Sequence, residues 1–381
     1  MPSVERLIAH PRLPLVAGLD AAGPAVHVWD CTDGAPRRSG VIERRGGPYD
    51  DEAAFGWDRR ERTPAVAWHP TDPVLVVATA EDLVQWTPET VAPLPLPLPV
   101  ASGARLPAIA FAPGGGALWT PAGRLDLDTG DLREGPEWDT GLAVHPAGRV
   151  AAALRSDQGA TLVLFTPFDA GQLHMRILNR ALILAADGYQ TPVFNADGRL
   201  LAVRGNNYEH SVDVFAFPSL RKVLATRLDG PDEYWDWSMH NLAFGAHPGV
   251  LYVGTPAGTV IAIDVERRAA AEHPALDGSP VTALAALATG GLVVAGAGGE
   301  LRLFEEAAGE TRPDAEAATT LLGGTAPMPD DAEEPEYLTD GVRSWGPGDL
   351  ETVTEAEPTD PSWLRIAARM NGLRSGADAA D

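Results

Sequence analysis

The chain has 381 residues, 45% of them of apolar type, and a formal net charge of -24 at pH 7. This acidity argues against binding to nucleic acid or to an anionic membrane surface, because both need a basic protein face. The single cysteine, Cys31, excludes an internal disulfide framework, and no stretch approaches 18 apolar residues, the length of a membrane-spanning helix. Charges and prolines interrupt the first 21 residues, so no signal peptide is indicated and we expect a cytoplasmic protein.

One pattern of strands and turns recurs seven times over residues 4–304. In each copy an apolar stretch runs into a short polar turn, a second apolar stretch follows, and a third ends on a large side chain. The turns are spaced by about 46 residues on average, near the length of one four-stranded propeller blade. The sequence therefore predicts an all-β fold for residues 1–304, a seven-bladed β-propeller of four-stranded blades. The seven turn positions are Pro11, Pro70, Pro113, Pro146, Ala196, Pro248 and Thr289.

The third stretch of each copy carries a family resemblance. These stretches end at Trp29-Asp30, Trp86, Leu127, Phe165, Phe215, Ile263 and Phe304. Together with the period, they resemble the WD-repeat propeller family, although the first copy alone ends its third stretch on the Trp-Asp pair and the family's Gly-His pair is absent from the sequence. The resemblance implies the propeller architecture and transfers no catalytic residue to this chain.

Four histidines, His10, His69, His145 and His247, occupy the same turn of four different copies, each directly before a proline. Equivalent positions of different blades lie far apart around the axis, so these side chains cannot converge on one metal. We expect each histidine to close its own turn between two strands. The sequence has neither a nucleophile elbow nor a phosphate-binding glycine loop, and we predict no cofactor, no metal site and no catalytic residue.

Prolines occupy every second position near the end of the second copy, at Pro93, Pro95, Pro97 and Pro99. Alternate residues of a strand direct their N–H groups to opposite edges, so these prolines remove donors from one edge only. That arrangement suits the outer strand of a blade, which has to resist pairing with other chains. We favour this interpretation over a polyproline recognition segment, because the prolines never have the three-residue spacing of groove-binding ligands.

The long connections between blades place aromatic residues beside acidic ones on one face of the expected propeller. Exposed aromatic side chains ringed by charge are typical of protein-binding hot spots. The candidate partner-binding residues are Trp57, Tyr189, Tyr208, Tyr234, Trp235 and Trp237. The alternative is that Trp57, Trp235 and Trp237 fold inward and fill the space beneath their loops.

The composition changes after Phe304. Residues 305–381 carry 18 acidic and five basic side chains, and residues 305–360 are poor in core-forming types, so we expect a flexible acidic tail there. Its one strand-like stretch, residues 319–322, could supply the outer strand of the last blade. That blade otherwise has three strands, since the first copy begins directly on an inner strand.

An amphipathic helix is predicted over residues 361–373. Asp360 can cap it, Pro361 suits its first turn, and Gly372 suits its end. Trp363, Ile366 and Met370 are the expected docking residues of its apolar face. This helix could dock on the chain's own propeller or act as a tethered motif for a partner, and the sequence leaves both possibilities open.

Two functions from different classes are compatible with this architecture. We favour a non-enzymatic scaffold that holds one or more partner proteins on the aromatic, acidic loop face and by the C-terminal helix, with the oligomeric state left open. The alternative is a small-molecule-binding or catalytic propeller with its site at the mouth of the central channel. The residues expected at that mouth are mixed in sign and lack the converging carboxylates of a metal site. They are Glu5, Arg62, Arg105, Asp139, Gln190, His240 and Ser279.

Overall fold

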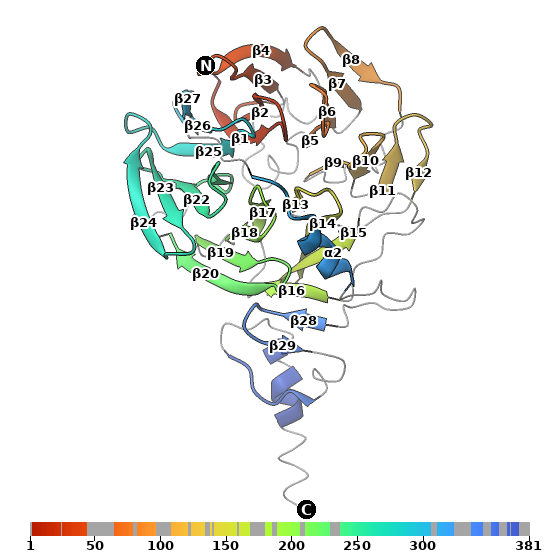
Figure 1. The fold of residues 1–381 in the computed structure, drawn as a ribbon, viewed down its shortest axis with the longest axis vertical. Coiled ribbons are helices and arrows are strands. Elements are labelled where there is room, and N and C mark those ends of the chain that lie inside the picture. Colours follow the sequence, from red (N-terminus) through yellow and green to blue (C-terminus); the bar gives the residue numbers. More distant parts are fainter. Residues whose placement is uncertain are drawn as a thin grey trace, which may run out of the picture.

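Seven sheets surround a central axis, and each strand pairs antiparallel with its neighbour within a blade (Figure 1). The chain is therefore a seven-bladed β-propeller, as predicted. The computed structural model describes residues 2–23, 25–43, 65–78, 82–96, 108–120, 123–133, 138, 141–157, 160–167, 180–184, 189–205, 210–228, 237–305, 311–323, 337–345, 352–357, 364–365 and 367–372.

Each blade is one sheet whose strands follow one another in chain order from the axis outward. Blade one consists of β1 (Val4–Ala9), β2 (Leu15–Asp20), β3 (Val26–Asp30) and β4 (Arg37–Ile42), and blade two of β5 (Ala65–Trp68), β6 (Leu75–Ala78), β7 (Leu83–Trp86) and β8 (Val91–Leu94). Blade three consists of β9 (Ala110–Phe111), β10 (Ala117–Thr120), β11 (Gly123–Asp126) and β12 (Leu132–Arg133), and blade four begins with β13 (Gly141–Val144), β14 (Val150–Asp157), β15 (Ala160–Pro167) and β16 (Arg180–Leu184). Blade five consists of β17 (Gln190–Phe194), β18 (Leu200–Arg204), β19 (Ser211–Ala216) and β20 (Arg221–Arg227), and blade six of β21 (Leu242–Phe244), β22 (Val250–Gly254), β23 (Thr259–Asp264) and β24 (Ala269–Pro274). Blade seven has β25 (Val281–Ala286), β26 (Leu292–Gly296) and β27 (Leu301–Phe304).

The core lies between the blades, because the second strand of most blades is buried on both faces of its sheet. Between blades one and two, for example, the rings of Trp68 and Trp86 meet edge to face, with centroids 5.9 Å apart. The ring of blades closes in the same way, since Val4 and Trp29 of blade one share an apolar cluster with Val293 of blade seven. Side-chain packing between blades one and seven therefore closes the propeller.

The proline-rich outer strand has the predicted orientation. Thr87 and Thr90 exchange backbone hydrogen bonds of 2.8 and 3.3 Å, so alternation along β8 turns the peptide groups of Ala92 and Leu94 inward and Pro93 outward. The side chain of Leu94 packs against the apolar core between blades two and three. Pro93 therefore removes a donor from the outer edge without weakening the blade.

The tail differs from the prediction at residues 319–322, which belong to helix α2 (Ala315–Gly323) and do not form a strand of the last blade. Asp314 caps this helix, because its Oδ1 accepts hydrogen bonds of 3.0 Å from the N–H groups of Glu316 and Ala317. The side chains of Ala318 and Leu321 are buried in the core between blades four and five. A capped, alanine-rich start and this apolar docking surface favour the helix over a strand.

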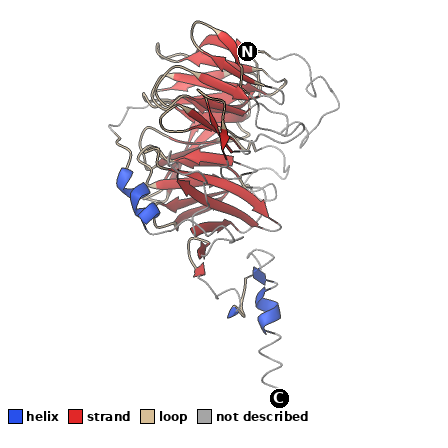
Figure 2. Ribbon diagram, turned by 90° about the vertical axis from the view of Figure 1, so that its right-hand side faces the viewer, coloured by secondary structure: helices blue, strands red, loops and turns tan. Residues whose placement is uncertain are grey.

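Helix α2 lies against one face of the propeller disc (Figure 2). The backbone N–H of Asp314 donates to Asp197 O at 2.7 Å, and Arg149 Nη1 donates to Thr319 Oγ1 at 2.8 Å. Both contacts are made with the turns between first and second strands, so α2 covers these turns of blades four and five.

A second part of the tail extends blade four. Strand β28 (Tyr337–Thr339) pairs parallel to β16 and antiparallel to β29 (Ser344–Trp345), giving a sheet of six strands. The turn after β28 contacts blade five, where the N–H of Lys222 donates to Gly341 O at 3.0 Å. Flexibility of residues 305–360 remains a prediction, but two of its segments have regular structure in contact with the blades.

The C-terminal helix docks on a different face from the predicted one. Residues 364–365 and 367–372 are helical, and the buried side chains are Leu364, Ala368 and Asn371. Leu364 belongs to an apolar cluster with Leu164, Ile183 and Trp345, so the helix contacts its own chain at blade four. Met370 is 49% exposed and does not dock, while Trp363 and Ile366 lie outside the described residues. The buried positions recur every three or four residues, one step away from the predicted stripe.

Candidate functional site

The structure describes two residues of the predicted aromatic loop face, and both are buried. Tyr189 is 5% exposed, and its hydroxyl donates to Asp213 Oδ2 at 3.4 Å. Trp237 is 7% exposed and packs in the core between blades five and six, with its ring beside His210. The expectation of exposed rings is therefore wrong for Tyr189 and Trp237, and Trp237 follows the inward alternative. Trp57, Tyr208, Tyr234 and Trp235 lie outside the described residues.

Tyr189 contacts a partly buried ion pair that was not predicted from the sequence. Asp213 of β19 lies 3.5 Å from Lys222 Nζ on β20, and Lys222 is the one lysine in the chain. Burial raises the pKa of Asp213, while the ammonium of Lys222 opposes this shift. The feature of the sequence that could have predicted this ion pair is the acidic Asp213 between Val212 and Val214, in a strand that is apolar on both faces.

Hydroxyl side chains at or near the starts of the inner strands, where the channel mouth is expected, hydrogen-bond between neighbouring blades. Thr191 Oγ1 of blade five donates to Met239 O at 2.9 Å, ahead of blade six. Ser238 Oγ donates to Thr282 O of blade seven, and Thr282 Oγ1 donates to Val4 O of blade one. Thr191 and Thr282 both lie at register irregularities of their inner strands, which direct these hydroxyls toward the next blade.

Most of the other residues expected at the mouth are engaged within the chain or lie outside its described part. Ser279 Oγ donates to Glu300 Oε2 at 3.0 Å and accepts from Gly298 N at 3.0 Å. His240 Nδ1 lies 3.0 Å from Thr191 Oγ1, and Glu5 sits at an irregularity of β1 between Val4 and Arg6. These contacts tie the described mouth residues to neighbouring elements of the fold. Arg62, Arg105 and Asp139 lie outside the described residues, as does the side chain of Gln190.

Arg204 is the centre of a buried polar network. Its guanidinium is fully buried and donates to neutral acceptors, namely Asn241 Oδ1, Ser211 O, His210 Nδ1 and Ser238 O, at 3.0 to 3.3 Å. Burial lowers the pKa of Arg204 to about 10. Through Asn241 and Ser238, this one side chain joins blade five to blade six.

The turn histidines close their own turns, as predicted, and two of them also bond to the following blade. In each of the four turns the Nδ1 atom accepts a backbone N–H of the same turn, as from Leu13 to His10 at 3.0 Å and from Ala147 to His145 at 3.2 Å. The Nε2 atoms of His10 and His145 donate to carbonyls of the following blade, at Asp72 O and Gly198 O, over 2.8 and 3.0 Å. These two side chains therefore also join neighbouring blades.

Glycine allows the following turn to approach His145, and a second glycine lies in the same way against His69. Gly115 and Gly198 have φ angles of 76° and 77°, which disfavour other residues, and a Cβ atom there would lie 1.9 Å from His69 Nε2 and 2.1 Å from His145 Nε2. In blade five Asn195 replaces the histidine, since its Oδ1 accepts from Leu200 N at 3.0 Å and its Nδ2 donates to Pro248 O at 2.7 Å.

These contacts predict a pH dependence of stability. Burial lowers the pKa of His145 and of His10, so the unfolded chain takes up protons below about pH 6.5 that the folded chain does not. The free energy of unfolding should therefore fall as the pH decreases from 7 to 5. Asp197 and Asp314 lie near His145 and oppose the lowered pKa, and Asp72 does so near His10.

The double variant His10→Asn/His145→Asn tests this prediction, because Asn195 shows that asparagine makes both bonds at this position. Urea unfolding at pH 7 and pH 5 should show a smaller loss of stability for the variant than for the parent chain. An equal loss in both proteins would contradict a role for the two histidines.

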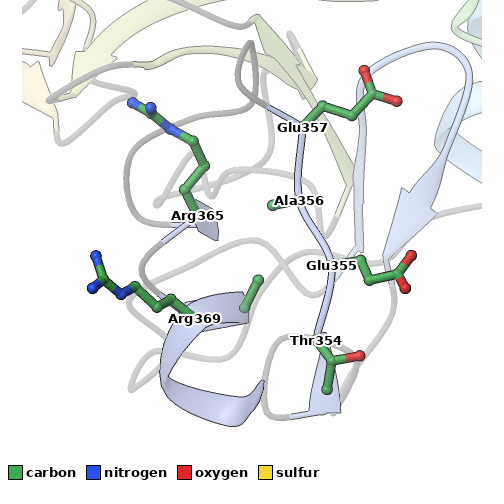
Figure 3. A pocket seen from close by; sticks show the side chains of 7 residues that line it. Thr354, Glu355, Ala356, Glu357, Arg365 and Arg369 are labelled. Carbon is green, nitrogen blue, oxygen red and sulfur yellow. The ribbon is translucent and has the colours of Figure 1, made fainter. Parts of the chain in front are cut away.

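The C-terminal segment contains a hollow of about 550 Å³ between residues 354–357 and the C-terminal helix. Arg365 and Arg369 lie on one side of it, and Glu355 and Glu357 lie on the other (Figure 3). Because charges of both signs line the hollow, its electrostatics do not favour one class of charged ligand.

Among the described residues, no group of three or more His, Cys, Asp or Glu side chains could hold a metal ion. In the same part of the chain, every helix is too short or too polar to cross a membrane. Comparison with known proteins finds no matching family model and no matching curated protein.

Proposed function

We propose that this propeller is a non-enzymatic scaffold that binds partner proteins. The observation that supports it is that the propeller already holds polypeptide segments of its own tail. Strand β28 adds to the outer edge of β16, and α2 inserts Leu321 into the core between blades four and five. Strand addition and helix-in-groove packing are two general modes of peptide recognition.

The proposed partner site is the loop face opposite the turns that α2 covers. Trp57, Tyr208, Tyr234 and Trp235 are its candidate contact residues, and the buried Trp237 anchors the chain directly after residues 229–236. A net charge of -24 favours a basic partner, because opposite charge accelerates encounter and suppresses wrong partners. Membership of the WD-like propellers is part of this proposal and rests on the repeat pattern.

The channel mouth has less support as a ligand site. Thr191, Ser238, Thr282 and Ser279 all use their hydroxyls in bonds to neighbouring strands or blades. A small molecule would have to compete with these bonds, and that competition would weaken contacts between blades.

A matched pair of tryptophan variants tests the loop face. Trp235→Ala should weaken capture of the partner by about 2 kcal/mol or more and leave the melting temperature unchanged, as expected for a contact residue. Trp237→Ala should instead lower the free energy of unfolding by about 3–5 kcal/mol, because it removes a buried ring.

The measurements are thermal melting of both variants and quantitative mass spectrometry of proteins retained from the native cell by the immobilised full chain. A large loss of melting temperature in Trp235→Ala with unchanged partners would contradict the loop-face proposal. Lost turnover of a small molecule with unchanged partners would favour the channel mouth instead.

A further inference from the structure

Blade seven ends on β27, and within the described part of the chain no strand pairs with its outer edge. The hydrogen bond from Gly296 N to Glu300 O, 2.9 Å long, turns the peptide oxygen of Glu300 toward β26. Peptide groups alternate along an antiparallel strand, so Arg302 also bonds toward β26. The peptide groups of Leu301 and Leu303 consequently point toward the open edge.

The other six blades protect their outer edges in ways that prevent strand addition. The protecting features are Arg38 on β4, Pro93 on β8, the two-residue length of β12, β28 over β16, Arg221 on β20 and Pro274 on β24. Strand β27 has the sequence Leu-Arg-Leu-Phe. Its one charge, Arg302, is paired with Asp277 of the loop between blades six and seven. The edge of β27 therefore carries neither a proline nor an unengaged charge.

The end of the third strand is less buried in blade seven than in four of the other blades, and it is half-buried at Leu127 of blade three as well. Trp29, Trp86, Phe165 and Phe215 end the third strands of four other blades, and all four are buried beneath or beside an outer strand. Phe304 holds the same position in blade seven but is half-buried, as is Leu303. An added strand would bury the exposed parts of both side chains.

The charges at the ends of β27 determine which kind of strand could pair with its open edge. Glu300 precedes the strand and Glu305 follows it, with Glu305 exposed. In an antiparallel pair of two copies, Glu300 of one copy would approach Glu305 of the other, between chains that each carry a net charge of -24. A second copy is therefore disfavoured, and basic residues at both ends of an incoming strand are favoured.

We propose that β27 accepts an extended segment of a partner protein as the fourth strand of blade seven. The segment would be apolar at alternate positions and basic at its ends. This inference rests on the proposed scaffold function and identifies a second contact, on the rim of the disc. Main-chain bonds to Leu301 and Leu303 provide affinity, and Glu300 and Glu305 select the charge.

The test uses the full chain and a fluorescent heptapeptide, Arg-Thr-Val-Thr-Val-Thr-Arg, with binding followed by anisotropy. The control peptides are one with Glu in place of both Arg and one with N-methylated backbone amides at alternate positions. The Arg peptide should bind at least about tenfold more tightly than either control, and hydrogen exchange at the Leu301 and Leu303 amides should slow in the complex.

Two proline variants locate the site. Leu303→Pro removes an outward N–H of β27 and should weaken peptide binding at least about tenfold. Val91→Pro is the matched control, because Val91 is also an outward position, on β8, and should leave binding unchanged. Glu305→Arg, at an exposed position, gives a second test that does not depend on tolerance of proline, and it should weaken the Arg peptide selectively.

Three outcomes would overturn the proposal. Equal binding of all three peptides would exclude strand addition. Slow hydrogen exchange of the Leu301 and Leu303 amides in the free monomer would show that a segment of the same chain already occupies the edge. Formation of a dimer that protects these amides would show that the occupant is a second copy of the chain. If the Arg peptide does not bind but Trp235→Ala still abolishes partner capture, the edge proposal is wrong and the scaffold proposal stands. If the parent chain also captures no partner, both proposals are wrong.

Discussion

Arg204→Ala should lower the free energy of unfolding by about 3–5 kcal/mol, one of the largest effects of any single substitution in this propeller. The change removes a fully buried guanidinium and takes the Arg204 donor from Asn241 Oδ1 and from the backbone carbonyl of Ser238. An unsatisfied buried acceptor costs about 1–3 kcal/mol, and the cavity adds to that cost. Urea unfolding followed by circular dichroism measures the effect.

Arg221→Ala is the matched control, since Arg221 is an exposed arginine on β20 of the same blade. Its substitution should change stability by less than about 0.5 kcal/mol. Arg204→Met should fall between the two variants, because it fills part of the cavity but cannot donate. If Arg204→Ala were as stable as Arg221→Ala, the network would not join blades five and six.

The sequence predicted the number of blades because the turn chemistry is local. A histidine or asparagine whose side chain accepts an N–H of its own turn can be read from a few residues, as at His145 and Asn195. The same locality explains Pro93, whose place on the outer edge follows from strand alternation alone. Repetition of such local signals determines the architecture.

Local sequence patterns could not predict the elements that depend on contacts with distant parts of the chain. Residues 319–322 have strand-forming composition, yet they lie in α2 because Leu321 finds an apolar site between blades four and five. The cap at Asp314 was readable, but the acidic composition around it favoured a flexible tail. Met370 was assigned to the docking face because a periodic stripe does not say which of its neighbours finds a partner surface.

The candidate site was harder to predict, because exposure of an aromatic ring depends on what lies beneath its loop. Tyr189 and Trp237 have the sequence context of exposed contact residues, but they pack in the cores of blades four to six. For Arg204 and Asp213 the sequence context does indicate burial, since each is a charged residue in an apolar strand. Such residues indicate a buried network, although the sequence does not show which groups complete it.

Truncation after residue 310 should destabilise the whole propeller. It removes α2 from the core between blades four and five, and it leaves the edge of β16 without β28. Leu321, which is 2% exposed, should alone account for about 2–5 kcal/mol when changed to alanine. Thermal melting of the truncated chain should therefore show a lower midpoint, together with increased binding of a hydrophobic dye.

Val342→Ala is the control within the tail, because Val342 is 82% exposed and its truncation should leave stability unchanged. Limited proteolysis gives an independent check, since a protected fragment should extend past Leu321 and not end near Phe304. A stable fragment of residues 1–304 with an unchanged midpoint would mean that α2 rests on the propeller without supporting it. In that case the tail would be a displaceable ligand of its own propeller, and its docking surface between blades four and five would be open to competing helices.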